Sequence, residues 1–117
     1  MDISNIKTVP QLSPWVTYEL EGAPFDPPVV KFRLRPLEAI DLMDSSKERP
    51  GRALAESARS AIAEWDFTDG DKPVLVTDET KTRYLTSGFL SLVVKGGSYL
   101  AVHIVLDARN KDTFLKN

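Results

Sequence analysis

The sequence predicts an α+β domain in which an N-terminal antiparallel β-hairpin is followed by three or four packed helices and one short extra strand. Three observations predict it: alternating apolar and charged residues at 30–35, an apolar stripe of helical period at 54–65, and proline or glycine near several segment boundaries. The chain of 117 residues suits one domain, assigned to residues 15–108. Residues 1–14 are expected to form a flexible N-terminal arm, and residues 109–117 a polar C-terminal tail.

The hairpin is expected from two segments separated by a proline-rich loop. Residues 15–20 are rich in β-branched and aromatic side chains, as strands are. Residues 30–35 place apolar side chains on one face and cations on the other. These cations either form a solvent face that discourages edge pairing or bind an acidic partner. They are Lys31, Arg33 and Arg35.

Two helices are expected in the middle of the chain. Pro36 suits the first turn of a short helix over residues 37–45. Pro50 and Gly51 then precede a second helix that carries the apolar stripe and ends at Trp65, whose indole is expected to be a core anchor. The stripe consists of Leu54, Ala58, Ala61, Ile62 and Trp65.

The C-terminal half begins with a turn signal at Asp69-Gly70 and a short strand-like segment, 73–76. Thr77 is a good N-cap for a helix that continues, with a bend near Ser87-Gly88, to a glycine stop at 95–97. Residues 98–108 are expected to form a last helix. A strand remains the alternative there, because this segment includes a β-branched run.

Composition excludes several classes of function. The formal net charge of −2 and the pI near 5.4 give no electrostatic footprint for nucleic acid. The absence of cysteine excludes disulfides and thiolate chemistry. No apolar run approaches the ~18 residues of a membrane span, and the first residues lack the pattern of a signal peptide. We therefore expect a cytoplasmic protein without membrane contact.

The residues give no pattern for catalysis, a cofactor or a metal. His103 is the only histidine and lies inside an apolar run, where a packed histidine is more common than a reactive one. Within the acidic stretch 64–79, residues 66–71 invite comparison with a calcium loop, but their carboxylates and Gly70 fall at the wrong spacing. We expect either a solvated turn or a contact for a basic partner there, and no enzyme.

Two segments resemble the small tail assembly chaperones of long-tailed, siphovirus-type phages and prophages. One is Phe32-Arg33-Leu34-Arg35-Pro36-Leu37, similar to the family's strand, Leu-Arg-Pro-Leu and helix unit. The other is Ile62–Glu79, which resembles the family's helix ending in a tryptophan, acidic turn, apolar stretch and capped helix. The resemblance covers residues 30–108, whereas Trp15 and the proline-rich loop depart from the family pattern.

The resemblance implies a non-enzymatic chaperone that binds the tape-measure protein and the major tail protein in the bacterial host cytoplasm. It also implies self-association and absence from the mature virion. Two alternatives remain: a virion component, such as a tail terminator or head–tail connector, and an unrelated intracellular protein-binding regulator. The residues expected to contact a partner are Tyr84, Phe89, Tyr99, Lys31, Arg33 and Arg35. For the three aromatic residues, simple packing in the core is the alternative.

Overall fold

The computed structural model describes residues 12–37 and 50–115, which form seven strands and five helices. The strands are β1 (Val16–Glu21), β2 (Val29–Leu34), β3 (Ile62–Trp65), β4 (Thr68–Asp69), β5 (Lys72–Pro73), β6 (Val93–Val94) and β7 (Ser98–Tyr99). The helices are α2 (Pro50–Ala61), α3 (Asp78–Tyr84), α4 (Ser87–Leu90), α5 (Leu100–Arg109) and α6 (Lys111–Leu115).

The N-terminal hairpin is confirmed. Strands β1 and β2 pair antiparallel, with Val16 opposite Phe32 and Tyr18 opposite Val30. Their side chains alternate as the sequence predicts: Phe32 and Leu34 are fully buried, while the intervening positions are exposed or half-buried. One face of the hairpin therefore contributes to the core and the other faces outward.

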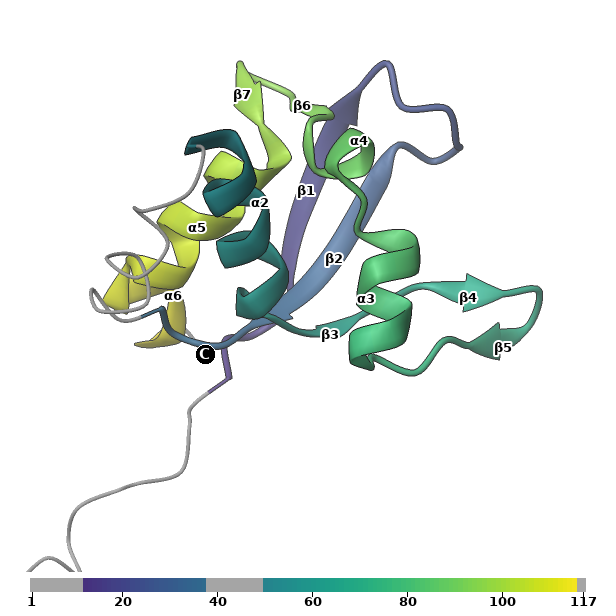
Figure 1. Ribbon diagram of the computed structural model, residues 1–117, viewed down its shortest axis with the longest axis horizontal. Coiled ribbons are helices and arrows are strands. Elements are labelled where there is room, and N and C mark those ends of the chain that lie inside the picture. Colours follow the sequence, from purple (N-terminus) through teal and green to yellow (C-terminus); the bar gives the residue numbers. More distant parts are fainter. Residues whose placement is uncertain (1–11, 38–49, 116–117) are drawn as a thin grey trace, which may run out of the picture.

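The hairpin lies at the centre of a five-stranded antiparallel sheet of order β3-β2-β1-β6-β7. Strand β6 thus pairs with the first strand of the chain, and β7 pairs with β6 at the edge of the sheet. A separate two-stranded hairpin, β4–β5, extends away from the sheet (Figure 1). Both of its strands are exposed, so it contributes little to the core.

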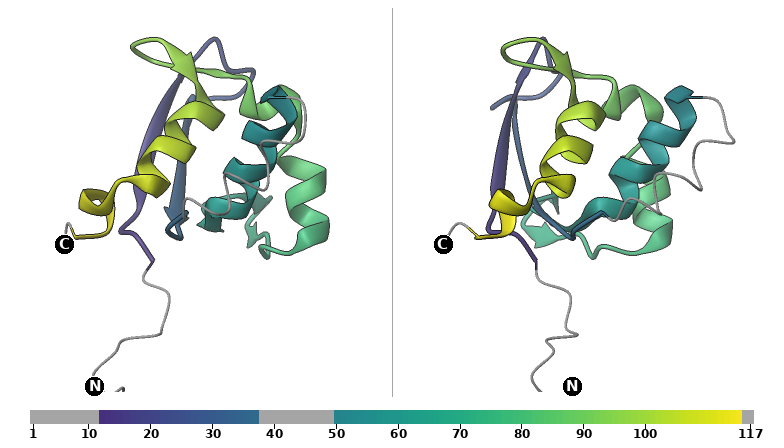
Figure 2. Two further views of the ribbon diagram at one scale, coloured as in Figure 1. Left: turned by 60° about the vertical axis from the view of Figure 1, so that its left-hand side comes forward. Right: turned by 90° about the vertical axis from the view of Figure 1, so that its left-hand side faces the viewer.

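Helices α2 and α5 lie on one side of the β1–β2 hairpin (Figure 2). Small buried side chains on both helices allow the close packing expected of an alanine-rich interface. They are Ala53, Ala55, Ala58 and Ala61 on α2, and Ala101 and Ala108 on α5. The helix predicted at 98–108 is confirmed from residue 100 onward as α5, where the strand alternative is wrong, whereas Ser98 and Tyr99 form strand β7. Larger side chains complete the core, including Leu34, Ile62, Leu85 and Ile104.

Two hydrogen bonds connect the sheet to distant parts of the chain. The Tyr18 hydroxyl donates to Oδ2 of Asp107 over 2.8 Å, which ties β1 to α5. Burial raises the pKa of Tyr18 far above its ordinary value, and the hydrogen bond and negative charge of Asp107 act in the same direction. The second hydrogen bond lies at the end of β2, where the backbone N–H of Leu34 donates to Oγ of the buried Ser13 over 2.9 Å.

The prediction that the second helix ends at Trp65 is wrong. Helix α2 stops at Ala61, and the next four residues form strand β3, in which Trp65 pairs with Phe32 and Glu64 with Arg33. An ion pair of 3.1 Å between Arg33 and Glu64 crosses the same two strands. Trp65 is nevertheless the core anchor that was expected, with 7% of its surface exposed.

Two other predicted boundaries also change. The strand expected at 73–76 is reduced to Lys72–Pro73, and residues 74–76 have no regular structure. The helix that begins after Thr77 ends at Tyr84 rather than continuing to the glycines. Residues 95–97 instead form the turn between β6 and β7, where Gly96 and Gly97 adopt positive φ of 101° and 107°.

The helix predicted over 37–45 falls mostly outside the described residues. Leu37 is the part of it that the structure describes: its side chain is buried, and its backbone N–H donates to the carbonyl of Ala108. This hydrogen bond attaches the segment that follows β2 to the C-terminal part of α5.

Candidate functional site: an aromatic groove

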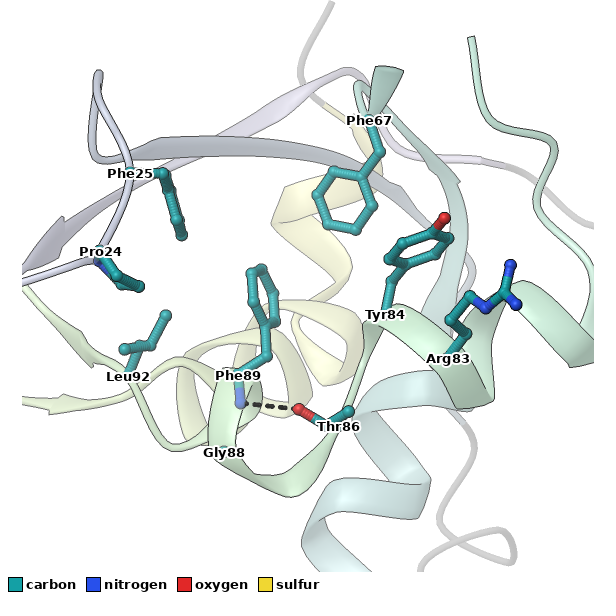
Figure 3. A pocket seen from close by; sticks show the side chains of 9 residues that line it. All are labelled: Pro24, Phe25, Phe67, Arg83, Tyr84, Thr86, Gly88, Phe89 and Leu92. Atoms are coloured by element: carbon teal, nitrogen blue, oxygen red, sulfur yellow. Dashed lines mark hydrogen bonds between the residues drawn. The ribbon is translucent and has the colours of Figure 1, made fainter. Parts of the chain in front are cut away.

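An apolar groove with a volume of about 460 Å³ lies between the β1–β2 loop and the bend that joins α3 to α4 (Figure 3). Such a volume falls within the ~300–1,000 Å³ of typical ligand pockets. Three separate parts of the chain line it: the loop, the residue that follows β3 by two positions, and the segment 83–92. The lining residues are Pro24, Phe25, Phe67, Arg83, Tyr84, Thr86, Gly88, Phe89 and Leu92.

Four aromatic rings line the groove and contact one another. The ring of Phe89 stacks on Phe25 with 6.3 Å between centroids, and it meets the edge of Phe67 at 5.7 Å. Phe67 also meets the ring of Tyr84 edge to face at 6.5 Å. These are the offset and perpendicular arrangements that aromatic rings favour. The groove wall is thus a continuous aromatic surface.

The bend between α3 and α4 places Tyr84 and Phe89 on the same groove. Helix α3 ends at Tyr84, and Thr86 starts α4 as its N-cap, accepting a hydrogen bond from the N–H of Phe89 over 3.2 Å. Between them, the fully buried Leu85 fixes the bend from inside. Its carbonyl accepts a 2.6 Å hydrogen bond from Nε of Arg59 on α2.

Phe67 is held in the opposite wall by the residues around it. Its ring stacks on the indole of Trp65 at 4.8 Å, and its carbonyl accepts a 3.0 Å hydrogen bond from the N–H of Val74. The indole Nε1 in turn donates to the carbonyl of Val74 over 2.7 Å. The start and the end of the β4–β5 hairpin are therefore fixed to the core, although the hairpin itself is exposed.

A smaller hollow of about 250 Å³ adjoins the groove and shares three of its rings. It is lined by Phe25, Val29, Val30, Asp66, Phe67 and Phe89. Asp66 is the charged residue of this hollow, and its Oδ1 accepts a 3.3 Å hydrogen bond from the backbone N–H of Lys31.

The predicted partner-binding aromatics separate into two groups. Tyr84 and Phe89 lie together in the groove, where 37% of the Tyr84 surface is exposed. Tyr99 is 56% exposed but lies on β7, opposite Val93, and does not line the groove. The structure thus brings together two of the three residues that the sequence suggested.

The three predicted cations differ in their surroundings. Arg33 is half-buried; its guanidinium pairs with Glu64 and also donates from Nε to the carbonyl of Ser13 over 3.0 Å. Lys31 is exposed on the same strand. Arg35 lies beyond β2 and close enough to α3 to affect Lys81, whose pKa is lowered by burial first and by the charge of Arg35 second.

Sequence reasoning missed Phe25 and Phe67. Both lie in segments of turn-like composition, Phe25 among prolines and Phe67 among aspartates, and such segments are usually solvated. The feature that could have indicated a role for these two residues is a large apolar side chain in a loop, where the loop itself does not require one. At 37% exposure, Phe25 is unusual for a phenylalanine, whose type is mostly buried.

Neither a carboxylate of the stretch 64–79 nor His103 lines the groove. No group of three or more histidine, aspartate or glutamate side chains is arranged to hold a metal ion within residues 12–37 and 50–115. His103 is half-buried on α5, and among the described residues its buried Nε2 has no hydrogen-bond partner. Nor does any helix in the described part of the chain have the length and apolar character to span a membrane.

Comparison of the chain with family models, with curated proteins and with solved structures finds no match in any of the three. The fold defines the protein as a small α+β domain with a solvent-accessible aromatic groove.

Proposed function

We propose that this protein is a non-enzymatic tail assembly chaperone of a long-tailed phage or prophage, which binds the tape-measure protein and the major tail protein in the bacterial cytoplasm. The observation that carries the proposal is the aromatic groove. Exposed apolar surface rimmed by polar residues is typical of a site for another protein. The resemblance at residues 30–37 and 62–79 supplies the particular class of client.

The groove suits an apolar client in its size and its chemistry. Its wall is built from aromatic rings, the side chains that most often anchor protein interfaces. The rings contact one another before any client arrives, so little conformational freedom is lost on binding. A chaperone that covers a long helical client repeatedly needs a site of this kind: ready-made, apolar and small enough to release its client.

The proposal departs in one respect from the pattern that suggested it. The tryptophan of the second resembling segment lies in strand β3 and not at a helix end. Its position still serves the groove, because the indole stacks beneath Phe67. The support from residues 62–79 therefore rests on the capped helix after Thr77 and on the aromatic wall, and no longer on a helix ending in tryptophan.

Co-expression with a phage tape-measure protein tests the proposal. The wild-type chain is expected to keep that protein soluble and to co-purify with it. Phe25→Ala removes an exposed groove ring and is expected to reduce the yield of complex about tenfold, which corresponds to ~1.4 kcal/mol. Trp15→Ala is the matched control, since Trp15 is 50% exposed but does not line the groove.

Co-expression without a gain in solubility and without co-purification would contradict the chaperone proposal. Mass spectrometry of purified virions provides an independent measurement. The chaperone is expected to be absent from them, whereas stoichiometric presence would identify a structural component such as a tail terminator.

A further inference from the structure

We infer that Arg83 makes the groove selective for an amphipathic client helix that carries a carboxylate directly beside its apolar anchors. The inference deepens the proposed function and rests on it, because it specifies which segments of a helical client the groove accepts. The client helix binds in one orientation, with its carboxylate at the Tyr84 end of the groove.

The distribution of charge along the groove is the first argument. Among its nine lining residues, Arg83 carries the only charge and Thr86 the only other polar side chain apart from the Tyr84 hydroxyl. The Arg83 side chain lies beside Tyr84 at one end, while Pro24 and Leu92 lie at the opposite, apolar end (Figure 3). A segment with anchors at one end and an acidic group at the other matches this gradient.

The second argument is that the guanidinium of Arg83 has no partner within the described part of the chain. Arg83 is exposed on α3, and within the described part of the chain it forms no ion pair or hydrogen bond. Arg33, by contrast, is occupied by Glu64 and by the carbonyl of Ser13. Arginine offers five donors in a planar fork that fits a carboxylate with two parallel hydrogen bonds. Arg83 therefore has its full hydrogen-bonding capacity available to a client.

The third argument concerns the shape of the client. A peptide that adds a strand needs an open sheet edge at its binding site. None of the nine groove residues belongs to a strand; they lie in a loop, in a bend, and on or beside two short helices. Recognition must therefore come from side chains that enter the groove. A helix supplies these at positions i, i+3 and i+4 while satisfying its own backbone.

Two synthetic helical peptides test the inference. Both are 18 residues long with the same composition, including three leucines and one phenylalanine on one face. In the first, two glutamates flank that face; in the second, the same glutamates lie on the opposite face. Binding is followed by the fluorescence of Trp65 in a Trp15→Phe background, since the Trp65 ring contacts both Phe67 and Tyr84.

The first peptide is expected to bind about fivefold more tightly than the second at low salt, and the difference should shrink at 1 M salt, where charges are screened within ~3 Å. Arg83→Gln is expected to abolish the difference without weakening the second peptide. Arg109→Gln, which removes an exposed arginine on α5, is the matched control and should preserve it.

Equal binding of the two peptides, or a preference that survives Arg83→Gln, would overturn the inference. Failure of both peptides to bind would also overturn it, yet would leave the proposed function standing if the tape-measure protein still co-purifies. Selective peptide binding without co-purification would instead sink the proposed function. Self-association that Phe25→Ala abolishes would identify a second copy of this chain as the occupant of the groove.

Discussion

At the scale of single residues, the hydrogen bond between Tyr18 and Asp107 is the most informative contact in the core. It joins residues 89 positions apart and places a hydroxyl inside an apolar layer, with 4% of the Tyr18 surface exposed. A buried hydroxyl without a partner is costly, so the carboxylate of Asp107 makes this position tolerable. Loss of the Tyr18 proton would bring two negative charges together.

The stability of the protein is therefore expected to depend on pH through Tyr18. Its folded-state pKa is raised, first by burial, so its contribution is fully present below its unfolded pKa of about 10 and is lost as the pH rises above that value. The expected slope is at most ~1.4 kcal/mol of unfolding free energy per pH unit. Urea unfolding between pH 8 and 11 measures it.

Tyr18→Phe is the comparison for this experiment. It removes the titrating group while keeping the ring that contacts Phe32 at 6.1 Å. Its unfolding free energy should be lower than that of the wild type near neutral pH and should fall less steeply above pH 10. Parallel curves for the two proteins would show that other groups cause the alkaline loss.

At the scale of elements, helix α3 depends on its first turn. Thr77 accepts from the N–H of Thr80 over 3.1 Å, and Thr80 Oγ1 accepts in return from the N–H of Thr77 over 2.8 Å. This reciprocal arrangement is a capping box with threonine at its third position in place of the usual glutamate or glutamine. Asp78 and Glu79 in the same turn complement the helix dipole. A seven-residue helix without a buried residue has few other sources of stability.

Thr77→Ala is accordingly expected to destabilise the protein by about 1 kcal/mol, the usual cost of losing an N-cap. Because α3 carries Tyr84 and Arg83, client binding should weaken as well. Thr82→Ala is the matched control, since Thr82 lies in the same helix and bonds only to the carbonyl of Asp78. Thermal unfolding measures both variants, and equal losses would rule out a special contribution from the cap.

The same elements show what could be predicted from the sequence. Thr77 was predicted as a cap because it combines a capping side chain with acidic residues in the following turn, all within a few residues. The end of α2 was mispredicted because Ile62 and Trp65 continue the spacing of a helical stripe. What makes them a strand is pairing with β2, more than 25 positions earlier in the chain. The local spacing of apolar residues contains no information about such a long-range contact.

The candidate site was predictable only where its residues belong to periodic segments. Tyr84 and Phe89 stood out as large aromatic side chains in a predicted helix. Phe25 and Phe67 lie in turns, and their roles arise from packing against Phe89. Arg83 is an exposed arginine on a helix, and its sequence context carries no sign of the groove beside it.

At the scale of the whole molecule, stability is distributed unevenly between the sheet and the β4–β5 hairpin. Amides of β1 and β2 lie within the paired, buried centre, whereas both strands of the β4–β5 hairpin are exposed. We expect hydrogen exchange at Asp69 and Lys72 to be faster than at Val30 and Phe32 by a factor on the order of 10³ or more. Amide exchange followed by NMR measures it, and uniform protection would show that the hairpin unfolds only with the core.

The position of β6, β7 and α5 beside β1 has a consequence for biosynthesis. A nascent chain that has emerged from the ribosome only as far as Leu90 lacks all three elements. Tyr18 then has no helix α5 to contact, and Leu20 has no strand β6 to pair with. Folding of the domain therefore completes only when α5 has been released. A ribosome stalled shortly before that point would carry an exposed apolar hairpin, which is a substrate for quality control.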